Sequence, residues 1–209
     1  MKKLRFKNIV SGGTIGTAAS LKAATTFFAH YGIESVMLFT LSGALVYGPV
    51  YGFIIGASIM VIADFMIGLV GLWTLYTALA YGLVGFLAGI VGMFKKEFTR
   101  VELAGLAFIF TIFFDAIAMT AFAFQFGIPL SIAAINQIPV TLIHTAGNTL
   151  LAFVFAPALM TIMNIISDQT VTEGLWRRVR VAKRYAVEGL INTRRSLKGI
   201  ESKKGIISR

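Results

Sequence analysis

From Ile9 to Ile166 the chain is almost continuously apolar, and this run limits the possible folds more than any other feature. Hydrophobic residues make up 57% of the 209 residues, and charged residues only 13%. Soluble domains are about 25% charged, and a soluble domain of this size could not bury so much apolar surface. An ordinary soluble enzyme, a disordered chain and a small disulfide-bonded domain are therefore excluded. The sequence predicts a polytopic membrane protein.

The basic residues lie mostly outside this apolar run. Of the 19 Lys and Arg residues, four precede Asn8 and eleven follow Ser167. The others are Lys22, Lys95, Lys96 and Arg100. Basic residues beside membrane spans favour the cytoplasmic side. The formal charge of +10 is therefore interpreted as a sign of membrane orientation, not of nucleic-acid binding.

Length and charge together predict six membrane spans. A span needs about 20 residues, and the basic N-terminus, loop 95–100 and tail should all be cytoplasmic. An even number of spans must then separate each basic segment from the next. Four spans before Lys95 and two spans after it meet this condition. The predicted spans are Ile9–Tyr31, Val36–Tyr47, Val50–Val70, Leu72–Phe94, Val101–Phe124 and Ile135–Ile166.

The predicted fold is an all-α integral membrane bundle of six transmembrane helices in the cell membrane, with both termini cytoplasmic. It comprises a basic N-terminus at 1–8, a transmembrane domain at 9–166 and a basic cytoplasmic tail at 167–209. Loops Gly32–Ser35, around Gly71 and Gly127–Ala134 would face outside. The tail has apolar and basic residues on opposite faces of a helix, which predicts an amphipathic helix on the inner leaflet or, alternatively, docking on a cytoplasmic partner.

Small residues recur at four-residue spacing in three of the predicted spans, which lets helix backbones approach closely in lipid. In the third and fourth spans we interpret them as packing positions within the bundle: Gly48, Gly52 and Gly56, and Gly85 and Gly89. The first span is only weakly hydrophobic, so docking on a partner protein and internal packing both remain open there. The candidate docking residues are Gly12, Gly16, Ala19 and Ala23.

Polar residues inside membrane spans are costly and therefore mark candidate sites. Most of them fall in the outer halves of the predicted spans, which indicates an outward-facing pocket. In the sixth span, four polar residues follow steps of 4, 3 and 4 and share one helix face. The predicted substrate-binding residues are Asp64, Trp73, Tyr76, Asp115, Asn136, Gln137, Thr141, His144 and Asn148.

Each of these residues also has a structural interpretation. Trp73 and Tyr76 suit the aromatic belt of a membrane interface, and Asp64 suits an internal charge pair with Lys22. His144 suits a hydrogen-bonded core position, and no metal site or cofactor is predicted. Pro139 is expected in the first turn of the sixth helix, where a missing N–H costs little, and Pro157 is expected to kink that helix.

Taken together, the chain resembles the substrate-binding S components of energy-coupling factor (ECF) transporters. The resemblance covers roughly 8–166 and includes six spans, a first helix rich in small residues and a final helix with His144, Asn148 and Pro157. Its most suggestive segment runs from Gly48-Pro49 through Gly56 towards Asp64. The long basic tail departs from the short end usual in that family.

The resemblance implies that the protein binds a vitamin or related micronutrient from outside. It also implies docking through the first helix, where Ala19 and Ala23 match the family's Ala-x-x-x-Ala pattern, onto a transmembrane coupling protein driven by two ATPases. The chain itself has no Walker motif, so we expect no catalytic activity of its own. The alternatives are a membrane scaffold for cell shape or division, and an intramembrane enzyme in which Asp64 and Asp115 form an aspartyl pair.

Overall fold

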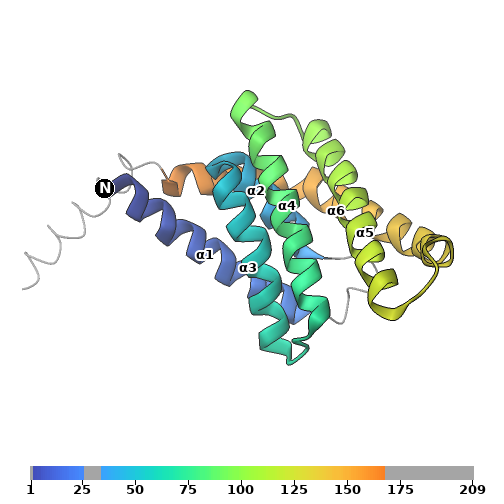
Figure 1. Ribbon diagram of the computed structural model, residues 1–209. Helices are drawn as coiled ribbons and strands as arrows, with labels where there is room; N and C mark the ends of the chain where they lie inside the picture. Colours follow the sequence, from blue (N-terminus) through green and yellow to red (C-terminus); the bar gives the residue numbers. More distant parts are fainter. Residues whose placement is uncertain (1, 26–33, 168–209) are drawn as a thin grey trace, which may run out of the picture. The chain divides into compact units, whose positions relative to one another are not determined.

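The computed structural model describes residues 2–25 and 34–167, and every regular element in these two ranges is an α-helix (Figure 1). Helices α3 to α6 are long and apolar enough to cross a membrane, whereas α2 is apolar but has only 13 residues. The predicted all-helical, membrane-embedded class is confirmed to this extent. The helices are α1 (Lys2–Thr25), α2 (Ser35–Tyr47), α3 (Pro49–Ile67), α4 (Leu72–Phe94), α5 (Arg100–Phe126) and α6 (Leu130–Ser167).

The short helix α2 lies at the centre of the bundle and contacts all five other helices. Every residue of α2 except Val46 is buried. A helix of 13 residues rises about 20 Å, well short of the roughly 30 Å thickness of the hydrocarbon layer. At least one end of α2 therefore lies inside the bundle instead of at a membrane surface.

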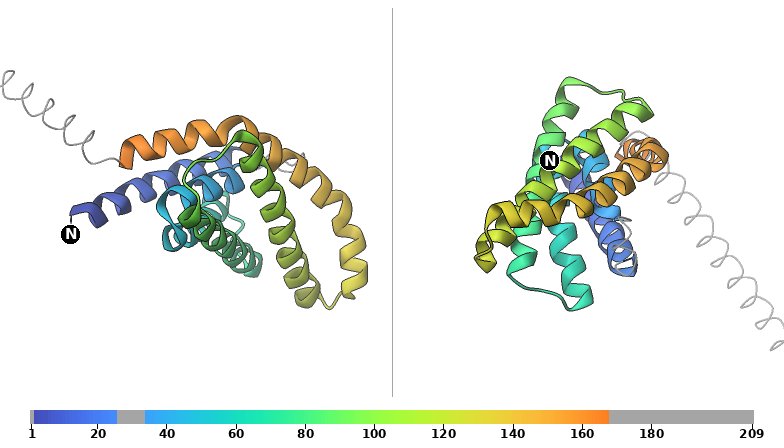
Figure 2. Two further views of the ribbon diagram at one scale, coloured as in Figure 1. Left: turned by 90° about the horizontal axis from the view of Figure 1, so that it is seen from above. Right: turned by 90° about the vertical axis from the view of Figure 1, so that its right-hand side faces the viewer.

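The remaining helices form two hairpins and a lateral helix around α2. Helices α3 and α4 pack along each other, as do α5 and α6, while α1 lies against α2 and α3 (Figure 1). Helix α6 curves along its length (Figure 2). It contains both Pro139 and Pro157, and proline inside a helix removes a backbone hydrogen bond and bends the axis.

Local sequence chemistry explains where several helices begin and end. Gly48, with a φ of 95°, ends α2, and Pro49 starts α3 directly, as the predicted break at Gly48-Pro49 requires. Gly127 is left-handed and ends α5. At the start of α5 the Glu102 N–H donates to Thr99 Oγ1, and the Thr99 N–H donates to Glu102 Oε2.

The prediction was wrong at the start of α6. This helix begins at Leu130, not Ile135, so 130–134 are helical and the predicted loop Gly127–Ala134 is shorter. The carbonyl of Pro129 accepts the N–H groups of Ile132 and Ala133 at 3.0 and 3.1 Å, which starts the helix earlier. Pro139 therefore lies within the helix, not in its first turn.

Helix α1 also begins earlier than predicted, because residues from Lys2 onward are helical. The basic N-terminal segment is therefore continuous with the first helix. Residues 26–33, which hold the end of the predicted first span and half of the first predicted external loop, lie outside the described residues. The predicted amphipathic helix of the tail lies outside them as well.

Helices α3 and α4 approach each other backbone to backbone at their glycine residues. A Cβ atom on Gly52 would lie 2.2 Å from the carbonyl oxygen of Gly85, and one on Gly56 would lie 2.3 Å from that of Tyr81. A Cβ atom on Gly89 would lie 2.4 Å from Cα of Pro49. No side chain fits at these distances, so the predicted internal packing role of these glycines is confirmed.

We predict that Gly85→Ala lowers the free energy of unfolding by about 1–3 kcal/mol, the usual cost of overpacking a tight contact. Its new Cβ would lie 2.1 Å from the carbonyl oxygen of Gly52. Gly105→Ala, on the exposed side of α5 with nothing within 4 Å, is the matched control and should be neutral or slightly stabilising. Thermal unfolding in one detergent measures both variants, and equal melting temperatures would contradict the packing account.

Candidate functional site

A cavity of about 630 Å³ lies between the α5–α6 hairpin and the other helices. Its wall runs from exposed residues near helix ends, such as Trp73 and Asn136, to buried residues deeper in the bundle, such as Phe114 and Asp115. Small-molecule sites usually measure about 300–1,000 Å³, so this cavity has the size of a ligand pocket.

The carboxylate of Glu34 lies in the wall of the cavity, immediately before α2, and connects three helices. Its Oε1 accepts a hydrogen bond from Nζ of Lys22 in α1 at 2.8 Å. Its Oε2 lies 3.1 Å from Nε2 of His144 in α6 and accepts a hydrogen bond from the hydroxyl of Tyr81 in α4 at 3.2 Å. One side chain thus joins α1, α4 and α6.

His144 lies between two carboxylates. Its Nδ1 is 2.8 Å from Oδ1 of Asp115 in α5, while its Nε2 faces Glu34. A neutral imidazole carries only one N–H, so two such hydrogen bonds require one more proton, either on the ring or on a carboxyl group. With that proton counted, Lys22, Glu34, His144 and Asp115 sum to zero charge. We call these four residues the ionic cluster.

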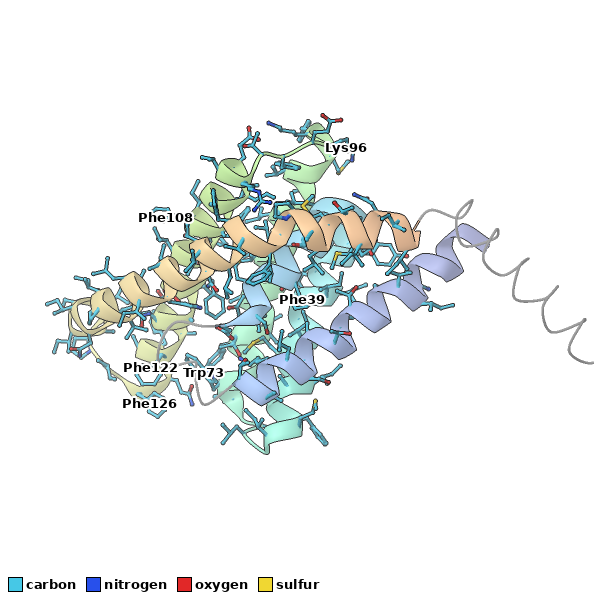
Figure 3. All side chains as sticks on the ribbon, turned by 180° about the vertical axis from the view of Figure 1, so that it is seen from behind. Phe39, Trp73, Lys96, Phe108, Phe122 and Phe126 are labelled. Atoms are coloured by element: carbon cyan, nitrogen blue, oxygen red, sulfur yellow. The ribbon has the colours of Figure 1, made fainter. Side chains whose placement is uncertain are left out.

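Aromatic rings cover the apolar part of the cavity wall. Phe114 stacks on Tyr81 with ring centroids 4.0 Å apart, and its ring meets His144 edge to face at 5.9 Å. Nearer the helix ends, Trp73 and Phe122 meet edge to face at 6.2 Å, and Figure 3 shows these two rings together at one end of the bundle. The cavity therefore combines an apolar, aromatic wall with a polar cluster, which is the usual composition of a ligand site.

The structure brings together five of the predicted substrate-binding residues in the cavity wall. They come from α4, α5 and α6, and they are Trp73, Asp115, Asn136, Gln137 and His144. The shared helix face in α6 is partly used for internal contacts, because Nε2 of Gln137 donates to Oγ1 of Thr141 at 3.2 Å. The binding role of all five residues remains a prediction.

The other four predicted residues lie elsewhere. Asp64 is buried and accepts a hydrogen bond from Thr74 at 2.8 Å, so its suggested pairing with Lys22 was wrong. Lys22 pairs with Glu34 instead, because Glu34 enters the bundle at the start of α2. Asn148 is buried and donates to Thr111 in α5. Neither Thr141, which lines a separate apolar hollow between α5 and α6, nor Tyr76 belongs to the wall of the cavity.

Three important residues were missed by the sequence analysis. Glu34 was assigned to an external loop, although its position directly before a 13-residue apolar segment was a usable signal. A 13-residue helix is too short to cross the membrane. If the C-terminal end of α2 lies near one membrane surface, Glu34 at its N-terminal end cannot reach the opposite surface. Tyr81 and Phe114 gave no signal, because single aromatic residues in apolar spans are common.

The candidate docking residues of α1 separate into exposed and buried positions. Gly12 and Gly16 are exposed, and a Cβ on either would meet no atom of another described segment within 4 Å. Ala19 is fully buried against the bundle, and Ala23 is partly buried. The exposed face therefore contains the two glycines but not the side chain of Ala19.

Among the described residues, no group of three or more His, Cys, Asp or Glu side chains is arranged to hold a metal ion. Comparisons with protein-family models, with curated proteins and with solved structures gave no match to this chain.

We predict that His144→Ala lowers the free energy of unfolding by about 3–5 kcal/mol, the usual cost of removing one partner from a buried ionic contact. The reason is that Glu34 and Asp115 would both lose the N–H group that each faces. Thr141→Ala, one turn earlier in α6 and outside the ionic cluster, is the control and should cost less than about 1 kcal/mol. Thermal unfolding in detergent measures both, and similar losses in the two variants would contradict the role of the cluster.

Proposed function

We propose that this protein is the substrate-specific membrane subunit of an ECF-type importer, which binds a vitamin or related micronutrient from the external side. The observation that carries this proposal is the cavity of about 630 Å³ with an ionic cluster in its wall. A buried cluster of this kind is costly in a membrane bundle, so its position beside a ligand-sized cavity favours a binding function. A purely structural scaffold needs no such cavity.

The proposed topology has six spans with both termini cytoplasmic, in the cell membrane. Trp73 lies at the start of α4 beside the cavity, and Lys96 follows the end of the same helix, so the two lie at opposite ends of the bundle in Figure 3. Lys95, Lys96 and Arg100 favour the cytoplasmic side for the second end. The cavity then opens towards the outside, as uptake of a nutrient requires.

The exposed face of α1 supports docking on a transmembrane coupling protein that is driven by two ATPases. Between 12 and 20, its exposed residues are all small: Gly12, Gly13, Gly16, Thr17 and Ser20. The exposed faces of α3 to α6, by contrast, carry many Leu, Ile, Val and Phe side chains, which suit lipid. A face of glycine and hydroxyl residues makes poor contact with lipid and lets another helix backbone approach closely.

The geometry does not favour an aspartyl-type enzyme. Asp64 is bonded to Thr74, whereas Asp115 is bonded to His144, so the two carboxylates belong to different hydrogen-bond groups. We therefore propose a binding subunit without catalytic activity, with ATP hydrolysis supplied by its partners.

We predict that the purified protein binds a small molecule that native mass spectrometry detects as a bound mass. Asn136→Trp places a large ring on an exposed part of the cavity wall and should weaken binding by about tenfold or more, because it occupies ligand space. Ile135→Trp is the control, since Ile135 is 67% exposed and lies outside the cavity wall. No bound mass from a broad micronutrient library, or equal binding by both variants, would contradict the proposed function.

The topology can be tested by cysteine labelling, because the chain has no native Cys. We predict that Gly71→Cys is labelled by an impermeant maleimide in intact cells, whereas Lys96→Cys is labelled only after permeabilisation. Gly71 precedes α4 and Lys96 follows it, so the two positions report on opposite ends of one helix. Labelling of Lys96→Cys in intact cells would reject the proposed orientation.

We predict that Gly12→Leu combined with Gly16→Leu abolishes co-purification with the coupling protein, because two large side chains would separate the helix backbones. The isolated subunit should stay folded, since no atom of residues 2–25 and 34–167 beyond the helix itself lies within 4 Å of either added Cβ. Gly105→Leu, on the exposed side of α5, is the control for an added leucine. Full recovery of the complex with the double variant would rule out docking through this face.

A further inference from the structure

Within the part of the chain that the structure describes, one oxygen of the ionic cluster has no hydrogen-bond partner. Asp115 is only 4% exposed and uses Oδ1 for His144, while its Oδ2 is buried and accepts no hydrogen bond from any described residue. Buried carboxylate oxygens are nearly always hydrogen-bonded, because leaving one unpaired loses its hydration without compensation. Asp115 also belongs to the cavity wall, so a rotation of its side chain that turns Oδ2 towards the cavity would let a ligand supply the missing partner.

The donors of the neighbouring side chains are already directed elsewhere. His144 places one ring nitrogen against each carboxylate, and both Tyr81 and Lys22 donate to Glu34. A ligand carboxylate near Asp115 would place an anionic acceptor beside the acceptor Oδ2, and the ionic cluster, whose charges sum to zero, has no excess positive charge to offset this repulsion. An acidic ligand group is therefore disfavoured at this part of the cavity, and a donor group is favoured.

The rest of the wall fits a flat ring attached to that donor. Trp73, Phe114 and Phe122 line the cavity, and aromatic faces attract both planar rings and cationic nitrogen. Gln137, in the same wall, can accept through its amide oxygen, because its amide nitrogen already donates to Thr141. Donor-rich heterocycles meet both of these requirements.

Resting on the proposed binding function, we infer that the ligand is an amino-substituted nitrogen heterocycle whose amino group donates an N–H to the carboxylate of Asp115. Adenine and 6-methylpurine form a suitable probe pair, because an amino group is replaced by a methyl group of similar size. The pair 2-aminopyridine and 2-methylpyridine repeats the comparison on a smaller ring, and nicotinate is the acidic probe.

The experiment measures binding of these probes to the full-length protein in detergent by saturation-transfer NMR, with native mass spectrometry for co-purified compounds. Each amino compound should bind about tenfold or more tightly than its methyl partner, which is the effect of one charge-assisted hydrogen bond. Asp115→Asn should remove this preference. Asp64→Asn is the matched control, because Asp64 is a buried carboxylate outside the cavity wall.

The outcomes separate this inference from the proposed function. Equal binding within each pair, preferential binding of nicotinate, or a co-purified compound without an N–H donor would overturn the inference and leave the binding function standing. Persistence of the preference in Asp115→Asn would also overturn it. If Asp115→Asn does not fold, the comparison of paired probes on the wild-type protein decides the question. Absence of any bound small molecule would overturn both.

Discussion

The hydrogen bonds of Glu34 are the interaction on which the arrangement of this bundle depends. Glu34 is held inside the bundle because α2 is short and buried, and it is bonded to residues of α1, α4 and α6. Without these contacts a carboxylate at this depth would carry a large desolvation cost. Because α2 places this carboxylate inside the bundle, nearby cationic or hydrogen-bond donor groups are needed to stabilise it. These groups are supplied by Lys22, Tyr81 and His144.

The two sides of the bundle are held together by different forces. Helices α3 and α4 approach at Gly52 and Gly85 so closely that no side chain separates them, and a Cβ atom on Gly92 of α4 would lie 2.6 Å from the carbonyl oxygen of Leu45 in α2. The α5–α6 hairpin instead reaches the rest of the bundle partly through the polar side chains of Asp115 and His144. Close packing at the glycines leaves no space between α3 and α4. Contacts through the longer side chains of Asp115 and His144 keep the α5–α6 hairpin further from the other helices, which explains why the cavity lies beside this hairpin.

Sequence patterns predicted the parts of this structure that depend on local chemistry. The break at Gly48-Pro49, the extent of α4 and the glycine contacts between α3 and α4 all follow from proline geometry, apolar length and small-residue spacing. The start of α6 could not be predicted in this way. The carbonyl of Pro129 accepts the first hydrogen bonds of the helix within a segment whose sequence is typical of a loop. Of the polar residues predicted to bind substrate in α6, Asn136, Gln137 and His144 lie in the cavity wall, whereas Thr141 and Asn148 do not.

The pairing of charges could not be predicted from the sequence, and the reason is physical. Lys22 had two possible acidic partners, Asp64 and Glu34, and the choice depends on how deeply α2 enters the bundle, which no local pattern encodes. Once α2 is buried, Glu34 forms the ion pair with Lys22. Asp64, near the end of α3, accepts a hydrogen bond from Thr74 instead. The same step places His144 between Glu34 and Asp115, so that each ring nitrogen faces one carboxylate. Burial of α2 therefore brings the four residues of the cluster together, and among the described residues this arrangement leaves Oδ2 of Asp115 without a hydrogen-bond partner.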